Sequence, residues 1–163
     1  MYNNVARLGV REESGSLRLP LGDGLDNNVL FLLPLSEGRV LMSGAFVSAG
    51  VTALGYVAIL DGGEFLPMQG GLDSPPRTVL RLDDGSWLVG GVFRQFSQDG
   101  GRVLSPCVAR WDGQRWHPMG TQSTARVRKL FRSAAGDILA FGDAPSGNGT
   151  VLLKWDGQAW ISL

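Results

Sequence analysis

The sequence has little of several things that would point to a specific chemistry. One cysteine in 163 residues excludes an internal disulfide and a cysteine-cluster zinc site. One histidine, His117, leaves any nucleophile a single imidazole base. Lys+Arg and Asp+Glu are 15 each, and this balance disfavours nucleic acid, because phosphate binding needs surplus cations. There is also no apolar run of about 18 residues, and residues 1–4 show no signal-peptide pattern.

Glycine, by contrast, is abundant. Glycine makes up 24 of the 163 residues, about twice its usual share of ~7%, and 44% of the residues are hydrophobic. This composition favours many short strands joined by tight turns, so we expect an all-β fold.

Three internal repeats organise the chain. A motif of the form apolar-Ala-x-Trp-Asp-Gly-x-x-Trp occurs at 57–65, 108–116 and 152–160, with Leu60 and Phe65 replacing the tryptophans in the first copy. Glycines at Gly38, Gly85 and Gly136 recur in the same order, with a period of about 48 residues. The first repeat predicts strands at 29–35, 39–46, 56–60 and 64–68. The second predicts strands at 77–82, 87–93, 107–111 and 114–118, and the third at 126–133, 138–142, 151–155 and 158–162.

Two local patterns need a decision. Residues 124–135 place apolar side chains at helical spacing, yet their register against the other repeats favours a strand. A two-residue turn at Asp112-Gly113 would place Trp111 opposite Gln114 and diagonal to Trp116 on one face of the sheet. We expect the following repeat to cover that aromatic face.

The N-terminus repeats the second half of this pattern. Residues 5–8 match 108–111, and residues 19–22 match 67–70. The sequence therefore predicts a single repeat domain, 1–163, made of a partial hairpin and three repeats. These units span 4–22, 28–70, 76–120 and 125–163.

These repeats resemble the blade of a kelch-type β-propeller. The Gly90-Gly91 pair and the tryptophans Trp111 and Trp116 match that blade, and the Trp-Asp-Gly form is similar to the delta-60 variant found in secreted bacterial proteins. The resemblance implies an all-β, β-propeller-type fold of about three and a half four-stranded antiparallel blades. Because a propeller ring takes about 4–8 blades, it also implies a homo-oligomer or the remaining blades of a larger protein. It favours a secreted, cell-surface or virion protein.

The candidate chemical groups mostly have structural interpretations. We expect His117 to be a packing or surface residue and Cys107 to be a half-buried small hydrophobic residue. Asp61, Asp112 and Asp156 are expected to belong to hairpin turns. The basic cluster at 126–132 has two interpretations, an anion site or an exposed strand. No catalytic residue, metal ligand or cofactor site is predicted.

The loops are the expected place for function on such a scaffold. The loops before each repeat and those after its second strand are expected to gather at one end, and the longest, at 94–106, mixes amide, acidic, basic and aromatic groups. The predicted binding residues are Asp26, Asn27, Asp73, Arg94, Gln95, Phe96, Gln98 and Asp99.

The predicted function is a non-enzymatic binding or structural β-propeller module whose loops contact protein or carbohydrate. The alternatives are a structural component of a virion or other large assembly, and a fragment of a carbohydrate-active or oxidase-like propeller enzyme.

Overall fold

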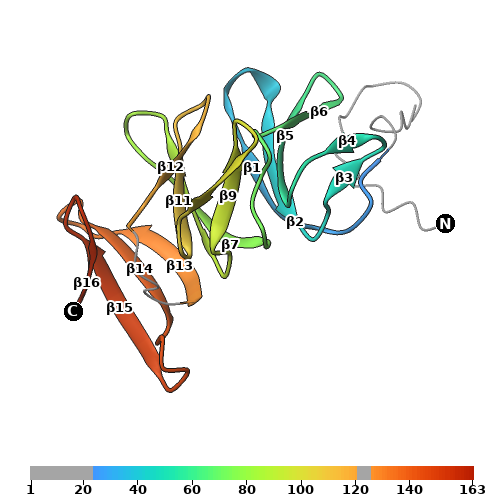
Figure 1. The fold of residues 1–163 in the computed structure, drawn as a ribbon. Helices are drawn as coiled ribbons and strands as arrows, with labels where there is room; N and C mark the ends of the chain where they lie inside the picture. Colours follow the sequence, from blue (N-terminus) through green and yellow to red (C-terminus); the bar gives the residue numbers. More distant parts are fainter. Residues whose placement is uncertain (1–23, 121–125) are drawn as a thin grey trace.

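Three four-stranded antiparallel sheets form most of the protein (Figure 1). The computed structural model describes residues 24–120 and 126–163, and the expectations for 1–23 and 121–125 lie outside these residues. The first sheet contains β1 (Val29–Pro34), β2 (Val40–Gly44), β5 (Val57–Asp61) and β6 (Glu64–Pro67), with the short 3-10 turn η1 (Ser36–Gly38) after β1. The second contains β7 (Pro76–Arg81), β8 (Trp87–Gly91), β11 (Val108–Trp111) and β12 (Trp116–Pro118). The third contains β13 (Arg126–Arg132), β14 (Ile138–Asp143), β15 (Thr150–Trp155) and β16 (Trp160–Ser162).

Each sheet is a simple meander. Its strands pair in chain order, so the predicted four strands per repeat are confirmed. The strand expected at 126–133 is also confirmed as β13. The strand prevails over helical spacing there because pairing with β14 buries Val127 and Leu130 against the second sheet. Two small hairpins, β3–β4 (Ser48–Ala49 and Thr52–Ala53) and β9–β10 (Gln95–Gln98 and Gly101–Leu104), follow β2 and β8.

A β-bulge recurs near the start of the first strand of each sheet. The pairing with the second strand shifts between Val29 and Phe31, between Pro76 and Thr78, and between Val127 and Lys129. A glycine of the second strand packs against the backbone just before each bulge. A Cβ at Gly44 would lie 2.1 Å from the carbonyl oxygen of Asn28, and equivalent backbone contacts occur at Gly91 and Gly142. These glycines are therefore required by close approach of two backbone segments.

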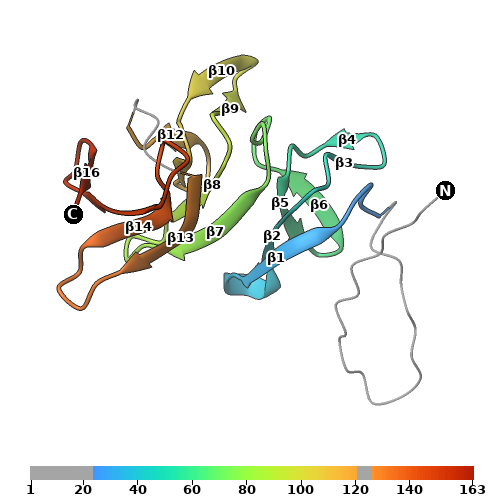
Figure 2. The ribbon, with the colours of Figure 1, turned by 90° about the horizontal axis from the view of Figure 1, so that it is seen from below.

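The three sheets stack through two apolar interfaces. One buried cluster joins the first sheet to the second and includes Leu41, Val89, Trp111 and Trp116. A second joins the second sheet to the third and includes Leu88, Leu130 and Trp160. Figure 2 shows β1, β7 and β13 along neighbouring edges of the three sheets.

The tryptophan hairpins correct two expectations. Trp111 lies directly opposite Trp116, with ring centroids 5.0 Å apart, and four residues form the connecting loop. The two-residue turn was wrong because Asp112 Oδ1 accepts hydrogen bonds from the backbone N–H groups of Gln114 and Arg115, which closes a longer loop. The pair still shares one face, since residues directly opposite each other in an antiparallel pair point the same way.

The aromatic face of each hairpin is covered by the preceding repeat, not by the following one. Trp116 Nε1 donates to the carbonyl oxygen of Met68 at 2.9 Å, and Trp160 Nε1 donates to that of Met119 at 3.0 Å. Each tryptophan thus contacts the residue that directly follows the last strand of the previous sheet. The expectation that the following repeat covers this face is therefore wrong, and Trp160 of the last repeat is buried.

Candidate functional site

Asp26 and Asp73 occupy equivalent places in the first two repeats. Asp26 Oδ1 accepts hydrogen bonds from the N–H groups of Val47 at 2.8 Å and Ser48 at 3.1 Å. Asp73 Oδ1 accepts from Arg94 at 2.9 Å and from Gln95 at 3.4 Å. Each carboxylate therefore fixes the start of the small hairpin that follows the second strand of its own sheet.

The leucine before each aspartate completes this brace. Leu25 forms an isolated antiparallel bridge with Ala49, and Leu72 forms one with Phe96. Both leucines are buried, as is Phe96. The Leu-Asp pair thus adds a short third segment to hairpins β3–β4 and β9–β10. A two-stranded hairpin is marginal by itself, so this addition holds the loop in place.

The remaining predicted binding residues lie on hairpin β9–β10 or beside β1. Gln98 Oε1 accepts a hydrogen bond from the N–H of Trp116 at 2.7 Å, and Asp99 Oδ2 lies 2.9 Å from a guanidinium nitrogen of Arg115. Asn27 Oδ1 accepts from the N–H of Asn28, and its side chain lies at the surface. Hairpin β9–β10 is therefore tied to the last strand of its sheet as well as to Asp73.

The eight predicted binding residues divide between the first and the second repeat. Asp26 and Asn27 lie before β1, whereas the other six lie at the second hairpin and its brace. The structure thus brings Asp73, Arg94, Gln95 and Phe96 together, while no contact joins them to Asp26 among the described residues. Their role in binding stays a prediction.

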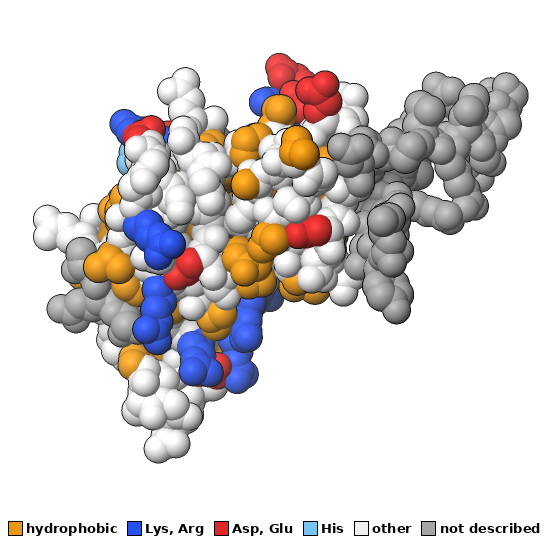
Figure 3. All heavy atoms as spheres, turned by 45° about the vertical axis from the view of Figure 1, so that its right-hand side comes forward, with side chains coloured by type: hydrophobic (Ala, Val, Ile, Leu, Met, Phe, Trp, Pro, Cys, Tyr) orange, Lys and Arg blue, Asp and Glu red, His pale blue; other side chains and the backbone are white. Residues whose placement is uncertain are grey.

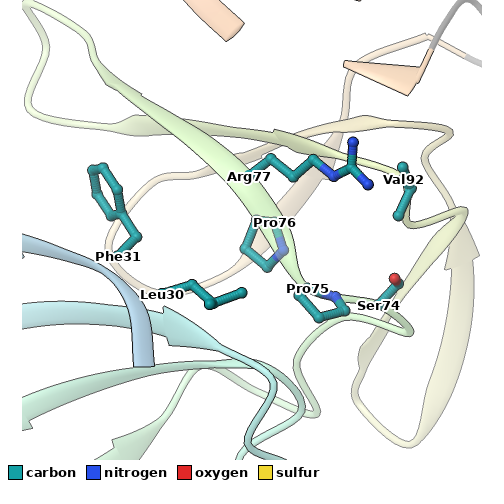
Figure 4. A pocket seen from close by; sticks show the side chains of 7 residues that line it. All are labelled: Leu30, Phe31, Ser74, Pro75, Pro76, Arg77 and Val92. Carbon is teal, nitrogen blue, oxygen red and sulfur yellow. The ribbon is translucent and has the colours of Figure 1, made fainter. Parts of the chain in front are cut away.

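Sequence reasoning missed a pocket next to the segment that leads into β7 (Figure 4). The pocket has a volume of about 450 Å³ and lies between β1 and the start of β7. Leu30 and Phe31 form one wall, and Val92 lies across from them. Ser74, Pro75, Pro76 and Arg77 complete the lining, and the Arg77 side chain extends toward Val92. The pocket is therefore mainly apolar with one guanidinium.

Basic residues concentrate on two neighbouring strands. Strands β7 and β13 carry six Lys or Arg residues and no acidic residue: Arg77, Arg81, Arg126, Arg128, Lys129 and Arg132. Figure 3 shows basic side chains gathered over the lower part of the face in view. Arg128 pairs with Asp143, and Arg132 pairs with Asp83. The predicted basic cluster is therefore an edge strand, with two of its four cations in ion pairs.

The turns between β7 and β8 and between β11 and β12 carry carboxylates with lowered pKa values. A hydrogen bond from His117, together with two backbone N–H donors, holds the pKa of Asp112 well below its usual range. Hydrogen bonds from Ser86 lower the pKa of Asp84, which also contacts Arg110. These anionic groups fix the turns and the ends of their strands.

Neither a metal centre nor a membrane-spanning helix is found in the described part. Within residues 24–120 and 126–163, no three His, Cys, Asp or Glu side chains gather as metal ligands. No helix there is long and apolar enough to cross a membrane. Cys107 is buried directly before β11, in the backbone position that Tyr56 occupies before β5, and both residues have positive φ values. Comparison with family models and with curated proteins finds no match to the chain.

Proposed function

We propose that the protein is a non-enzymatic binding module of the β-propeller type. In this proposal the sheets are blades, and the hairpins β3–β4 and β9–β10 form a surface that contacts a protein or a carbohydrate. The proposal rests on the kelch-like repeats and on the three stacked meanders with a bulge at the same place in each first strand.

The observation that carries the binding role is the brace on each hairpin. Asp26 and Asp73 use their carboxylates to hold backbone N–H groups of the loops. Bracing lowers the entropy that a loop loses on binding, which favours affinity for a ligand. Exposed side chains such as Val51 and Arg102 at the hairpins then remain free for contact.

A binding screen tests the proposal. The labelled full chain is applied to arrays of glycans and of displayed peptides, and each hit is measured again with variants. We expect Arg102→Ala and Val51→Ser to reduce binding at least about fivefold. Glu64→Ala, at the start of β6 after the turn that follows β5, serves as the matched control and should leave binding unchanged. A hit that responds equally to all three variants would refute the hairpin surface as the binding site.

A catalytic assay separates this proposal from the enzyme alternative. Among the acids at the hairpins, Asp26 and Asp73 are engaged by backbone donors and Asp99 is paired with Arg115, which supports a structural role for all three. We therefore expect no turnover of glycoside substrates by the purified chain. Turnover that is abolished by Asp73→Asn, with the fold retained, would favour the enzyme.

A further inference from the structure

The pocket between β1 and β7 contains an arginine that has no acidic partner in the described chain. Arg77 lines this pocket, and its side chain extends toward Val92 (Figure 4). Within residues 24–120 and 126–163, its guanidinium makes no hydrogen bond or ion pair. Its N–H donors therefore have no acceptor among these residues, although a guanidinium offers five of them.

The three repeats differ at this point of the fold. The β-bulge of the first strand leaves one residue of each repeat out of the pairing, namely Leu30, Arg77 and Arg128. The residue that follows the close-packed glycine of the second strand is, in the same order, Ala45, Val92 and Asp143. In the third repeat Arg128 pairs with Asp143, and the first repeat has an apolar residue at both positions. The second repeat therefore has the cation of this pair and lacks its acid.

The backbone that carries Arg77 is held by two sheets. Pro75 and Pro76 have φ values fixed by their rings. A Cβ at Gly91 of the second sheet would lie 3.0 Å from the carbonyl oxygen of Pro75 and from the Cα of Pro76. The buried hydroxyl oxygen of Ser43, in the first sheet, lies 3.4 Å from the carbonyl oxygen of Pro76. This wall of the pocket is therefore formed before any ligand binds, which lowers the entropic cost of binding.

The remaining lining defines the chemistry of a ligand. Leu30 and Phe31 line the side opposite Val92, and the volume of about 450 Å³ lies in the usual range of small-molecule sites. Such sites are mostly apolar, with a few polar groups that orient the ligand. The planar guanidinium of Arg77 matches a carboxylate through two parallel hydrogen bonds. Strands β7 and β13 carry no acidic residue, so the surrounding charge favours an anion.

We propose that this pocket binds a small apolar carboxylate, in which an aromatic or branched aliphatic group is attached to the acid. The ligand carboxylate pairs with Arg77 as Asp143 pairs with Arg128, and the apolar group packs against Leu30 and Phe31. A free acid and the last residue of a peptide can both supply this chemistry. No lining residue belongs to hairpins β3–β4 or β9–β10, so this is a site additional to the hairpin surface of the proposed function.

Nuclear magnetic resonance titration of the ¹⁵N-labelled full chain tests the site. We expect 3-phenylpropionate to shift the amide signals around Arg77 and Val92, with a dissociation constant on the order of 1 mM. The amide 3-phenylpropionamide, which lacks the charge, and acetate, which lacks the ring, should each bind at least about tenfold more weakly. An acetylated peptide that ends in phenylalanine separates the two sources. Tighter binding than the free acid assigns the pocket to a chain end, and weaker binding assigns it to a free acid.

Two pairs of variants test the role of the unpaired cation. Arg77→Gln should raise the dissociation constant for 3-phenylpropionate at least about tenfold, whereas Arg81→Gln, farther along β7 and outside the lining, should leave it unchanged. Val92→Asp supplies the acid that Arg128 already has and should weaken binding to a similar extent. Val92→Thr keeps the branched shape without a charge and should bind within about threefold of wild type. The dispersion of the amide signals of each variant checks that the fold is retained.

Three results would overturn the proposal. They are an absence of shifts around Arg77 at about 10 mM acid, equal binding of the acid and its amide, and wild-type affinity of Arg77→Gln. The hairpin variants Arg102→Ala and Val51→Ser should leave this binding unchanged. Failure of the pocket and failure of the hairpin screen are therefore separate results.

Discussion

Alanine at Gly44 would place a methyl group inside the van der Waals radius of a backbone carbonyl. The added Cβ would lie 2.1 Å from the oxygen of Asn28, more than 1 Å closer than the 3.4 Å of ordinary contact. That oxygen also accepts a hydrogen bond from the N–H of Ala45 at 2.9 Å. Relieving the clash therefore moves β1 away from β2 and weakens this bond. Overpacking with a weakened hydrogen bond corresponds to a loss of about 2–4 kcal/mol in the free energy of unfolding.

The other strand glycines turn this into a graded series. The nearest backbone atom is 2.2 Å away at Gly142, 3.0 Å at Gly91 and 3.5 Å at Gly101. None of these positions has a positive φ, so the series isolates the steric effect. We expect Gly142→Ala to match Gly44→Ala, Gly91→Ala to cost about 1 kcal/mol, and Gly101→Ala to change stability by less than about 0.5 kcal/mol.

Urea denaturation followed by tryptophan fluorescence measures this series, with the unfolding slope checked for each variant. The order of the midpoints should follow the order of the distances. If Gly44→Ala and Gly101→Ala unfold at the same urea concentration, the close backbone approach is not what selects glycine at the second strand of each repeat.

Three further changes have defined outcomes. Trp160→Phe removes the indole donor to Met119 and should cost about 1–3 kcal/mol of unfolding free energy in urea titrations, with the fold retained. Asp112 has a lowered folded-state pKa, so its stabilisation is present above its ordinary pKa of 3.8 and is lost as the pH falls below that value. The midpoint difference between wild type and Asp112→Asn should therefore narrow from pH 6 toward pH 2, and a constant difference would contradict the role of the His117 contact. Glu37→Gly relieves a φ of +61° in an exposed turn, so it should raise the free energy of unfolding by about 0.5–1 kcal/mol. A higher midpoint in thermal denaturation would show this.

The strands could be predicted because the three repeats carry the same markers in the same order. Gly38, Gly85 and Gly136 mark the same turn in three copies, so an ambiguous segment such as 126–132 could be assigned by comparison with the other two. Single-segment periodicity would have given a helix there. Comparison between repeats works because equivalent segments must pair with equivalent neighbours.

The direction of stacking could not be predicted in the same way. Alternation along a strand shows which residues share a face, but it does not show which neighbouring sheet covers that face. The direction depends on the reach of Trp116 and Trp160 back to carbonyl oxygens of the preceding sheet, which is a contact between repeats. The loop length at Asp112 was missed for a related reason, since a side-chain acceptor made a four-residue loop favourable where Asp-Gly is typical of a two-residue turn.

The sequence singled out the loop segments of the candidate surface, but it did not show what their aspartates do. Asp26 and Asp73 were selected as polar loop residues, and the structure gives both carboxylates a part in holding a hairpin. A signal was present in the sequence, because Gly-Leu-Asp occurs at 24–26 and again at 71–73. The equivalent residues of the third repeat are Gln122, Ser123 and Thr124, which break the pattern.

The third repeat also shows what the Leu-Asp pair is for. The connection from β14 to β15 spans residues 144–149 and contains no strand, whereas the equivalent connections of the first two repeats each contain a hairpin. The repeat that lacks the Leu-Asp pair is thus the one that lacks the hairpin. A two-residue strand such as β3 gains too few hydrogen bonds to be stable without further support. Loop and brace therefore form one unit, which is present in the first two repeats and absent from the described part of the third.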